Sequence, residues 1–339
     1  MRPVLLEMTP DQLRQAVVDA GGPAYRADQL ADWVYRKGTT DPAAMTNLPR
    51  GLAESFDILT SRVVARRESR DGVIKLLLEY PDGRQVETVL IPGESRVTAC
   101  LSTQVGCAFA CAFCASGTNG LARNLKTGEI LEQLLHLRQA AGRRITNVVF
   151  MGMGEPLANY SSALEAIRAI VDPDRFGISA RSVVLSTIGL PAQIRRLARE
   201  ALPITLAISL HAPTDALRRK LMPAAAKAAP LEKLLAAAET FFQSRNREIT
   251  LEYVLLEGIN DDIACAEALI GIAHRLRANV NLILYNPVES LPYRPPTRQA
   301  AAGFLARLRR RSVNAHLRRS RGADIAAACG QLRQSAGRR

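Results

Sequence analysis

The sequence predicts an α/β protein built around a parallel sheet, and three observations support this fold class. From about residue 96 onward, short apolar segments with strand character alternate with longer amphipathic segments with helix character. The 339 residues, 47% of them hydrophobic, are enough to bury a large core. Conspicuous polar and cysteine residues follow the ends of the predicted strands, which is where parallel sheets hold ligands.

Residues 1–60 predict a small helical accessory domain. Thr9 and Pro10 are of the types expected at a helix cap and at the first helical position. Apolar side chains then recur at helical spacing, among them Leu30, Trp33 and Val34.

Residues 61–95 change to a strand pattern. Apolar residues dominate 73–80 and 85–91, and the Pro-Asp-Gly-Arg turn at 81–84 joins these two segments. The pattern predicts a β-hairpin extension that precedes the core domain.

Residues 96–333 form the predicted core domain, and residues 334–339 are predicted to be a tail. The predicted strands span 96–103, 145–151, 182–187, 204–210, 249–256, 280–286 and 313–319. The predicted helices span 127–142, 158–171, 190–200, 230–245, 261–277 and 299–311. About six such repeats fit either an incomplete (β/α) barrel or an open doubly wound sheet, and periodicity does not separate these two folds.

Three cysteines form the most informative motif. Cys107, Cys111 and Cys114 have the spacing Cys-x3-Cys-x2-Cys. Structural zinc sites and ordinary iron–sulfur sites close their coordination with four protein ligands, so three thiolates leave one metal position open for a substrate or cofactor. The spacing resembles the cluster loop of the radical S-adenosylmethionine (SAM) enzymes, in which three cysteines bind a 4Fe-4S cluster.

A zinc site is the alternative for this loop. Its fourth ligand would have to be Cys100, seven residues upstream of the loop, or His136 on the next predicted helix. Because neither residue is local to the motif, we favour the open cluster.

Polar residues follow four further predicted strands. The run Met-Gly-Met-Gly-Glu-Pro at 151–156 predicts a glycine turn that exposes backbone and one carboxylate, which suits the binding of an amino group. The carboxyl ends of parallel strands meet at one edge of a sheet. We therefore predict that one small polar ligand is bound jointly by Gly154, Glu155, Ser186, Ser209, Leu210, His211 and Asn286.

The charge balance indicates a polyanionic partner. The net charge is +13, and residues 298–339 contribute +10 of it through eleven arginines and one acid. An arginine-rich solvated face is the alternative interpretation. We expect phosphate contacts from the arginines at 307, 309, 310, 311, 318, 319 and 321.

Membrane and secreted classes are not indicated. No apolar run reaches the length of a membrane span, and the N-terminal sequence lacks the apolar segment and cleavage site of a secretory signal. Six cysteines are too few for a secreted disulfide framework in a chain of this length. We therefore expect a cytoplasmic protein.

Four runs occur together in one order: the cysteine loop, Met-Gly-Met-Gly-Glu-Pro, Ser-Leu-His-Ala at 209–212, and Ala-Cys-Gly-Gln-Leu at 328–332. In this combination the chain resembles the RlmN/Cfr-type radical-SAM RNA adenine methyltransferase family over about residues 1–333. The resemblance implies an incomplete (β/α)6-type radical-SAM barrel, a 4Fe-4S cluster, SAM as a cofactor, and an RNA substrate that the N-terminal domain contacts. It also implies an electron donor such as flavodoxin or ferredoxin, and we expect a monomer.

The resemblance also assigns catalytic roles. Cys329 would accept a methyl group from SAM and form an S-methylcysteine intermediate, Cys100 would resolve a covalent protein–RNA intermediate through a disulfide, and Glu87 would be the proton acceptor. Without the resemblance, both cysteines are typical of small buried residues. Because Glu87 shares a strand face with Val89 and Ile91, we expect apolar neighbours to raise the pKa of its carboxyl group.

The position of methylation stays open. Leu121 and the runs at 186–189 and 285–287 are similar to the carbon-8 branch of the family, whereas Pro156 is similar to the carbon-2 branch. We favour carbon 2 of an adenosine in large-subunit ribosomal RNA, with transfer RNA as a second candidate, because this is the widespread activity of the family. The alternatives are carbon-8 methylation and a non-enzymatic, metal-stabilised RNA-binding protein.

Overall fold

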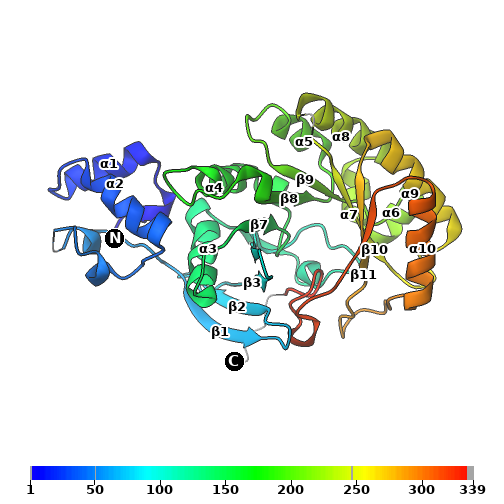
Figure 1. Ribbon diagram of the computed structural model, residues 1–339, viewed down its shortest axis with the longest axis horizontal. Coiled ribbons are helices and arrows are strands. Elements are labelled where there is room, and N and C mark those ends of the chain that lie inside the picture. Colours follow the sequence, from blue (N-terminus) through cyan, green and yellow to red (C-terminus); the bar gives the residue numbers. More distant parts are fainter. Residues whose placement is uncertain (1, 50, 246, 334–339) are drawn as a thin grey trace.

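The computed structural model describes residues 2–49, 51–245 and 247–333, and the predicted tail 334–339 lies outside this part of the chain. A small helical lobe at the N-terminus stands beside a large α/β body (Figure 1). The C-terminal segment returns to the strands of the hairpin extension, which places the two ends of the core domain next to each other (Figure 1).

The N-terminal lobe is held against the body by specific hydrogen bonds. Thr9 and Gln12 form a reciprocal capping box at the start of α1. The Glu7 carboxylate accepts a hydrogen bond of 2.9 Å from the amide of Gly128, and Arg138 donates to the carbonyl of Tyr35 at 2.9 Å. The lobe comprises η1 (Leu5–Glu7), α1 (Pro10–Asp19), α2 (Arg26–Ala31), the π-helical turn η2 (Asp32–Lys37), η3 (Pro42–Ala44) and η4 (Ala53–Ser55).

The predicted hairpin is confirmed as β2 (Ile74–Glu79) and β3 (Gln85–Pro92), which pair antiparallel. The structure adds the strand β1 (Arg62–Glu68) on the outer side of β2, which the sequence did not predict. The side chains of β1 are almost all exposed, so backbone hydrogen bonds hold this edge strand in the sheet. Its sequence therefore lacks the alternation of apolar and polar residues from which strands are predicted.

The strands of the core domain decide between the two sheet arrangements left open above. From β4 onward the strands of the large sheet are parallel and follow one another in chain order, without the reversal that marks a doubly wound sheet. The fold is therefore an incomplete barrel, and all seven predicted core strands are confirmed as β4 (Val97–Cys100), β7 (Asn147–Phe150), β8 (Val183–Thr187), β9 (Thr205–Ser209), β10 (Thr250–Leu255), β11 (Asn279–Leu284) and β12 (Ala315–Arg318).

The helices lie on the outer side of the curved sheet (Figure 1). Those predicted from the sequence are confirmed as α3 (Thr127–Ala141), α4 (Tyr160–Val171), α5 (Pro191–Leu197), α8 (Leu231–Arg245), α9 (Ile263–Leu276) and α10 (Arg298–Arg310). Two short helices between β9 and α8 were not predicted, α6 (Asp215–Leu221) and α7 (Pro223–Ala228). Within the described ranges, no helix combines the length and the apolar character of a membrane span.

Helix α3 buries polar side chains that hold two neighbouring segments of the chain. Its Gln133 is fully buried, accepts a hydrogen bond from the Ser102 amide and donates to the Ser102 carbonyl, both at 2.8 Å. The buried Glu132 carboxylate accepts backbone amide bonds from Thr60 at 2.8 Å and Ser61 at 2.7 Å. These contacts hold the chain directly after β4 and the segment before β1 on one helix.

Candidate active site

One cavity of 160 Å³ gathers most of the residues that the sequence singled out. It lies at the carboxyl ends of the parallel strands, where barrels of this kind bind their ligands. Nine predicted residues line it: Cys107, Cys111, Cys114, Gly154, Glu155, Ser186, Ser209, His211 and Cys329.

The cysteine loop is framed by a separate two-stranded ribbon of β5 (Gln104–Gly106) and β6 (Leu121–Asn124). Gly106 has a φ of +79°, and a Cβ atom there would lie 2.0 Å from the Gly120 carbonyl oxygen, so only glycine fits this closure. Within the loop, the Ala112 amide donates to the Leu221 carbonyl at 2.9 Å. The backbone of the loop is thereby anchored to both the ribbon and α6.

The three thiols are crowded and mostly screened from water. Burial raises the pKa of Cys107 to about 11 and also raises the pKa values of Cys111 and Cys114. Thiolate charge on the neighbouring cysteines raises the pKa of Cys111 further. Three thiolates here therefore need positive charge from a bound group, which is what an iron–sulfur cluster supplies.

The donor set is the one that the sequence predicted for an open cluster. Cys107, Cys111 and Cys114 line one cavity, and three thiolates leave one metal position for a further ligand. Within the described ranges, no three His, Cys, Asp or Glu side chains already form a metal-ion site.

The glycine turn after β7 lines the cavity, but its carboxylate is not exposed. Gly154 has a φ of +96°, and a Cβ there would lie 2.5 Å from Gln104. The side chain of Glu155 is buried, and its two oxygens accept amide bonds from Leu157 at 3.0 Å and Ile188 at 2.8 Å. The prediction of an exposed carboxylate is wrong, because the turn uses this side chain to tie itself to the end of β8. Burial raises the pKa of Glu155 to about 7.

The ends of β8 and β9 meet as predicted. The hydroxyls of Ser186 and Ser209 lie 3.1 Å apart at the cavity wall. His211 accepts a hydrogen bond from the Val254 amide on Nδ1, and burial lowers its pKa to about 3, so its ring is neutral and carries the proton on Nε2. Leu210 differs from these residues, because its side chain is packed in the apolar core and does not line the cavity.

The segment that carries Cys329 is fixed by contacts from several elements. Asn286, predicted to bind the cofactor, donates instead to the Cys329 carbonyl at 3.2 Å and faces a second cavity. Gln331 donates to the Pro287 carbonyl at 2.9 Å, and the Ser116 hydroxyl donates to the Leu332 carbonyl at 2.6 Å. Ala-Cys-Gly-Gln-Leu is thus docked beside the cysteine loop.

Cys329 stands between two cavities. It lines the first together with the cysteine loop, and it lines a second one of 90 Å³ together with Cys100. Burial raises the pKa of Cys100 to about 12. Crowding by the surrounding chain raises the pKa of Cys329 as well, although this residue is partly open to solvent, and the Arg318 guanidinium offsets part of both rises. Arg318 is itself oriented by an ion pair of 3.3 Å with Glu252.

The surroundings of Glu87 are not apolar, so that expectation is wrong. The ammonium group of Lys75 lies 2.8 Å from its carboxylate, and both side chains are buried. The second carboxylate oxygen accepts the Arg333 amide at 2.9 Å, while Lys75 also donates to the Ala326 carbonyl at 2.9 Å. The pair therefore clamps both sides of the Cys329 segment.

Comparison with known proteins places this site in a family. The profile of the Radical SAM superfamily matches residues 101–265, and that of the ribosomal RNA large subunit methyltransferase N-terminal domain matches residues 4–58. The probable dual-specificity RNA methyltransferase RlmN of Thermosynechococcus vestitus is 45% identical over 335 residues, 98% of each chain. The chain belongs to the RlmN family of radical-SAM RNA methyltransferases.

Further comparisons agree with this assignment. The dual-specificity RNA methyltransferase RlmN of Solidesulfovibrio magneticus is 42% identical and covers 97% of this chain and 96% of that one. The crystal structure of a radical SAM methyltransferase from Sphaerobacter thermophilus superimposes with a TM-score of 0.94 at 40% identity, over 97% of this chain and 99% of that chain. The predicted family, the radical-SAM fold and the RNA methyltransferase class are confirmed.

The C-terminal arginines of this RlmN-family protein are not all available for phosphate. Arg307 and Arg311 each form an ion pair of 3.0 Å with Glu267, and Arg321 pairs with Asp71 at 3.4 Å. Arg318 faces the active-site cavities, as described above. Phosphate contacts by several of the C-terminal arginines therefore stay a prediction, and Arg307, Arg311 and Arg321 also hold parts of the chain together.

The predictions from the sequence did not include Lys75 and Glu252, which both belong to the site of this RlmN-family protein. Lys75 had a visible signal, since it interrupts the apolar run from Ile74 to Leu78 and a charge inside a buried strand must be paired. Glu252 likewise interrupts the apolar strand β10, yet its partner Arg318 is remote in sequence and was interpreted as a phosphate contact.

Proposed function

We propose that this RlmN-family enzyme methylates carbon 2 of an adenosine in large-subunit ribosomal RNA, with transfer RNA as a second candidate substrate. One observation carries the proposal: Cys329 lines the same cavity as the three-cysteine loop and also the cavity that contains Cys100. A single thiol can thus face SAM on one side and a resolving cysteine on the other. The relatives named above, which are RNA methyltransferases, support the substrate class.

In this proposal Cys107, Cys111 and Cys114 would hold the cluster, and the cavity that they line would take SAM. When bound, the reduced cluster supplies the electron for radical chemistry on SAM. The glycine turn at Gly154 presents backbone to the ligand, and the hydroxyls of Ser186 and Ser209 provide hydrogen-bonding partners.

Cys329 acts as the nucleophile that accepts the methyl group. The guanidinium group of Arg318 favours its thiolate form, which is the reactive species. Once the methyl-derived carbon is bonded to both Cys329 and the adenine and the ring proton has been accepted, Cys100 attacks the Cys329 sulfur. The bond between that sulfur and the carbon breaks, the carbon keeps the electron pair and takes up a proton, and the product leaves. The Cys100–Cys329 disulfide is then reduced by an external thiol. Cys100 and Cys329 are both free thiols in this structure.

Glu87 is the proposed proton acceptor, and the structure sets a condition for this role. Its carboxylate is bonded to Lys75 and to the Arg333 amide, and it is buried under the Cys329 segment. The segment must release Arg333 before the carboxylate can reach a substrate proton. We therefore propose that RNA binding displaces the end of this segment.

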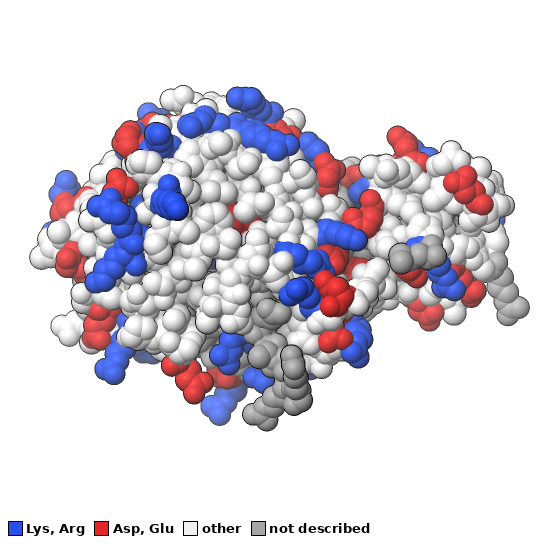
Figure 2. All heavy atoms as spheres, turned by 180° about the vertical axis from the view of Figure 1, so that it is seen from behind, with Lys and Arg blue, Asp and Glu red and all other residues white. Residues whose placement is uncertain are grey.

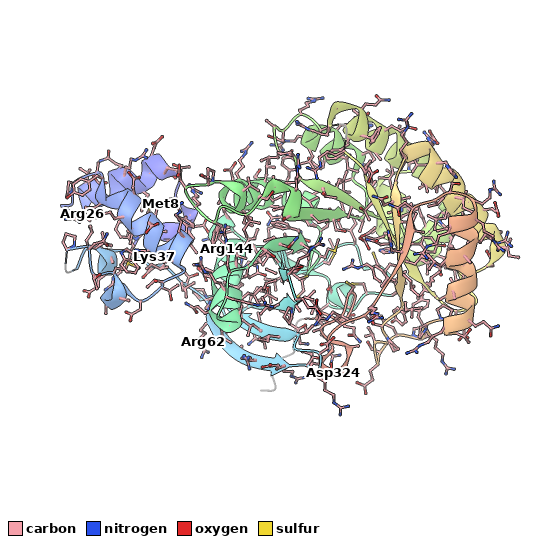
Figure 3. The ribbon with its side chains drawn as sticks, viewed as in Figure 1. Met8, Arg26, Lys37, Arg62, Arg144 and Asp324 are labelled. Atoms are coloured by element: carbon pink, nitrogen blue, oxygen red, sulfur yellow. The ribbon has the colours of Figure 1, made fainter. Side chains whose placement is uncertain are left out.

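A basic cavity beside the N-terminal lobe supports an RNA partner. It has a volume of 340 Å³ and is lined by four arginines, Arg36, Arg138, Arg144 and Arg175. Arg36 and Arg175 are partly neutralised by ion pairs with Asp32 at 4.0 Å and Asp172 at 3.8 Å, so Arg138 and Arg144 provide most of its positive charge. Arg144 lies between the lobe and the body (Figure 3). On the face seen in Figure 2, by contrast, basic side chains are interspersed with acidic ones, so net charge alone does not mark the RNA surface.

The test is anaerobic incubation of the reconstituted protein with SAM, a low-potential donor and unmodified ribosomal RNA, followed by mass spectrometry of the nucleosides. We expect 2-methyladenosine from the wild type and from Cys265→Ala, whose thiol lies outside both cavities, and none from Cys329→Ala. A product from Cys329→Ala would contradict the methyl-cysteine route. Formation of 8-methyladenosine would assign the carbon-8 reaction instead, and transfer RNA is the second substrate to test.

A further inference from the structure

Arg218, in the middle of helix α6, is a fully buried arginine outside the machinery described so far. Its Nη1 and Nη2 donate long hydrogen bonds to the carbonyls of Leu210 at 3.4 Å and Ile188 at 3.2 Å. Among the residues that the structure describes, its buried Nε has no partner. The nearby carboxylate of Asp215 uses one oxygen to accept the Leu231 amide and forms no ion pair with Arg218 within the described ranges.

Burying a guanidinium without a paired anion lowers the stability of the fold, because the charge is removed from water and the group does not deprotonate readily. Two neutral carbonyl oxygens compensate this only in part. The site thus has an unmatched positive charge, and a ligand or group of negative charge has to lie against it.

The cysteine loop is the element that packs there. Its Ala112 amide donates to the Leu221 carbonyl at 2.9 Å, one helical turn beyond Arg218. Cys111, Phe113 and Cys114 pack in the same apolar cluster as Leu217 and Leu221. Burial raises the pKa of the Cys111 thiol and lowers that of the Arg218 guanidinium, and the attraction between a Cys111 thiolate and Arg218 offsets part of both shifts.

Arg218 does not line the cavity itself. One of its two acceptors, Ile188, is part of the cavity wall, and His211, which follows the other acceptor Leu210, lines the cavity as well. The guanidinium therefore lies behind the wall that the cysteine loop, His211 and Ile188 share. From there it acts on charge in the cavity without contacting the substrate.

We propose that Arg218 is the fixed counter-charge of the cluster held by the cysteine loop, a positioning residue that makes the cluster easier to reduce. The proposal rests on the cluster site of the proposed function. Three thiolates make the cluster anionic, and it gains one further negative charge when it takes an electron from the donor, without making or breaking a bond. A buried positive charge at fixed distance stabilises the reduced form more than the oxidised form.

The test compares Arg218→Gln, which removes the charge, with Arg218→Lys, which retains it, and with Arg219→Met, an exposed neighbour on the same helix. Each protein is reconstituted anaerobically, assayed for iron and sulfide, and titrated potentiometrically with electron paramagnetic resonance detection. At a fixed potential we expect at least a tenfold lower ratio of reduced to oxidised cluster in Arg218→Gln, a shift of 59 mV for one electron.

Arg218→Lys should recover most of this shift, and Arg219→Met should match the wild type. The shift should persist in high salt, since a buried charge is screened far less than an exposed one. If Arg218→Gln does not fold, Arg218→Met is titrated in its place, because an apolar side chain of similar length avoids burying another polar group. A folded Gln variant that takes up no cluster, with uptake restored in the Lys variant, would equally support the counter-charge.

An unchanged potential in a neutral variant with full cluster content would overturn the inference, and so would an equal shift in the Lys variant. A wild type that takes up zinc, or no cluster at all, would instead refute the proposed function, and the inference with it. The readout is independent of turnover, so the two failures are distinguishable.

Discussion

The cysteine loop and the C-terminal segment meet at one cavity but are held in different ways. In the loop, backbone amides are anchored to neighbouring elements, while the thiols of Cys107 and Cys114 accept hydrogen bonds from within the loop itself. In the segment, side chains of the body bind the backbone on both sides of the nucleophile, and these contacts come from Lys75, Glu87, Ser116 and Asn286. The loop leaves its reactive atoms to be placed by a cofactor, whereas the fold itself places Cys329.

This difference follows from what each thiol has to do. A metal ligand is positioned by the metal it binds, so only the loop backbone needs to be in place beforehand. A nucleophile has no such partner before reaction, and an error of about 1 Å in its position can cost on the order of a hundredfold in rate. The C-terminal segment therefore needs its dense set of contacts.

The largest effect should come from removing a loop thiol. We expect Cys111→Ser to lose most of the bound iron and all detectable methylation, because an oxygen replaces one of three cluster ligands. The unfolding free energy of the metal-free protein should change by less than about 1 kcal/mol, since this thiol makes no hydrogen bond that holds the loop. Iron analysis and denaturant unfolding measure the two quantities, with Cys265→Ser as the control. A large loss of metal-free stability would contradict the view that the cofactor, and not the thiol, fixes the loop.

The next effect tests the clamp on the segment. Lys75→Met should lower the unfolding free energy by about 3–5 kcal/mol, because it leaves the Glu87 carboxylate buried without its partner. The double variant Lys75→Met/Glu87→Gln should recover part of this loss, as it removes the orphaned charge. Urea unfolding measures both, with the exposed Lys233→Met as the control. Equal stability of Lys75→Met and wild type would show that the pair does not hold the segment.

Glu155 ties the glycine turn to β8 and gives a pH-dependent prediction. Its pKa rises from 4.5 to about 7 on folding, so between these values the unfolded chain has lost this proton while the folded chain keeps it. The contribution of Glu155 to the free energy of unfolding should therefore fall by about 3 kcal/mol as the pH rises through that window, and stay level above it. Glu155→Gln should show a shallower fall between pH 5 and pH 8 in urea unfolding, and the exposed Glu165→Gln should not. Identical slopes for Glu155→Gln and wild type would refute this account.

The smallest effect concerns the reactivity of the nucleophile. Arg318 lowers the pKa of Cys329, so Arg318→Met should raise that pKa and shift the alkylation of this thiol to higher pH. We expect a several-fold slower reaction with iodoacetamide at neutral pH, followed by mass spectrometry of the Cys329 peptide. The exposed Arg310→Met, which lines neither cavity, is the matched control, and a shift of equal size in both variants would show that general surface charge, and not Arg318, activates the thiol.

Parts of the molecule with a strong local pattern were predicted well. The core strands, the hairpin and the six longer helices were found because apolar periodicity records which faces are buried. Strand β1 and helices α6 and α7 were missed, since an exposed edge strand and very short helices depend on partners that a local pattern does not contain. Asn286 was placed correctly at a strand end, but its contact with the Cys329 carbonyl could not be anticipated.

The sequence by itself determined the chemistry of the protein: the three-cysteine loop, the second pair of cysteines, the alternating core and the family to which they belong. Tertiary structure decided which charges act in the site. Lys75 with Glu87, Arg318 with Glu252, and the unpaired Arg218 are defined by neighbours remote in the chain. The physical reason is that the effect of a charge depends on its burial and on what lies within a few ångströms of it, and both are set only when distant segments pack together.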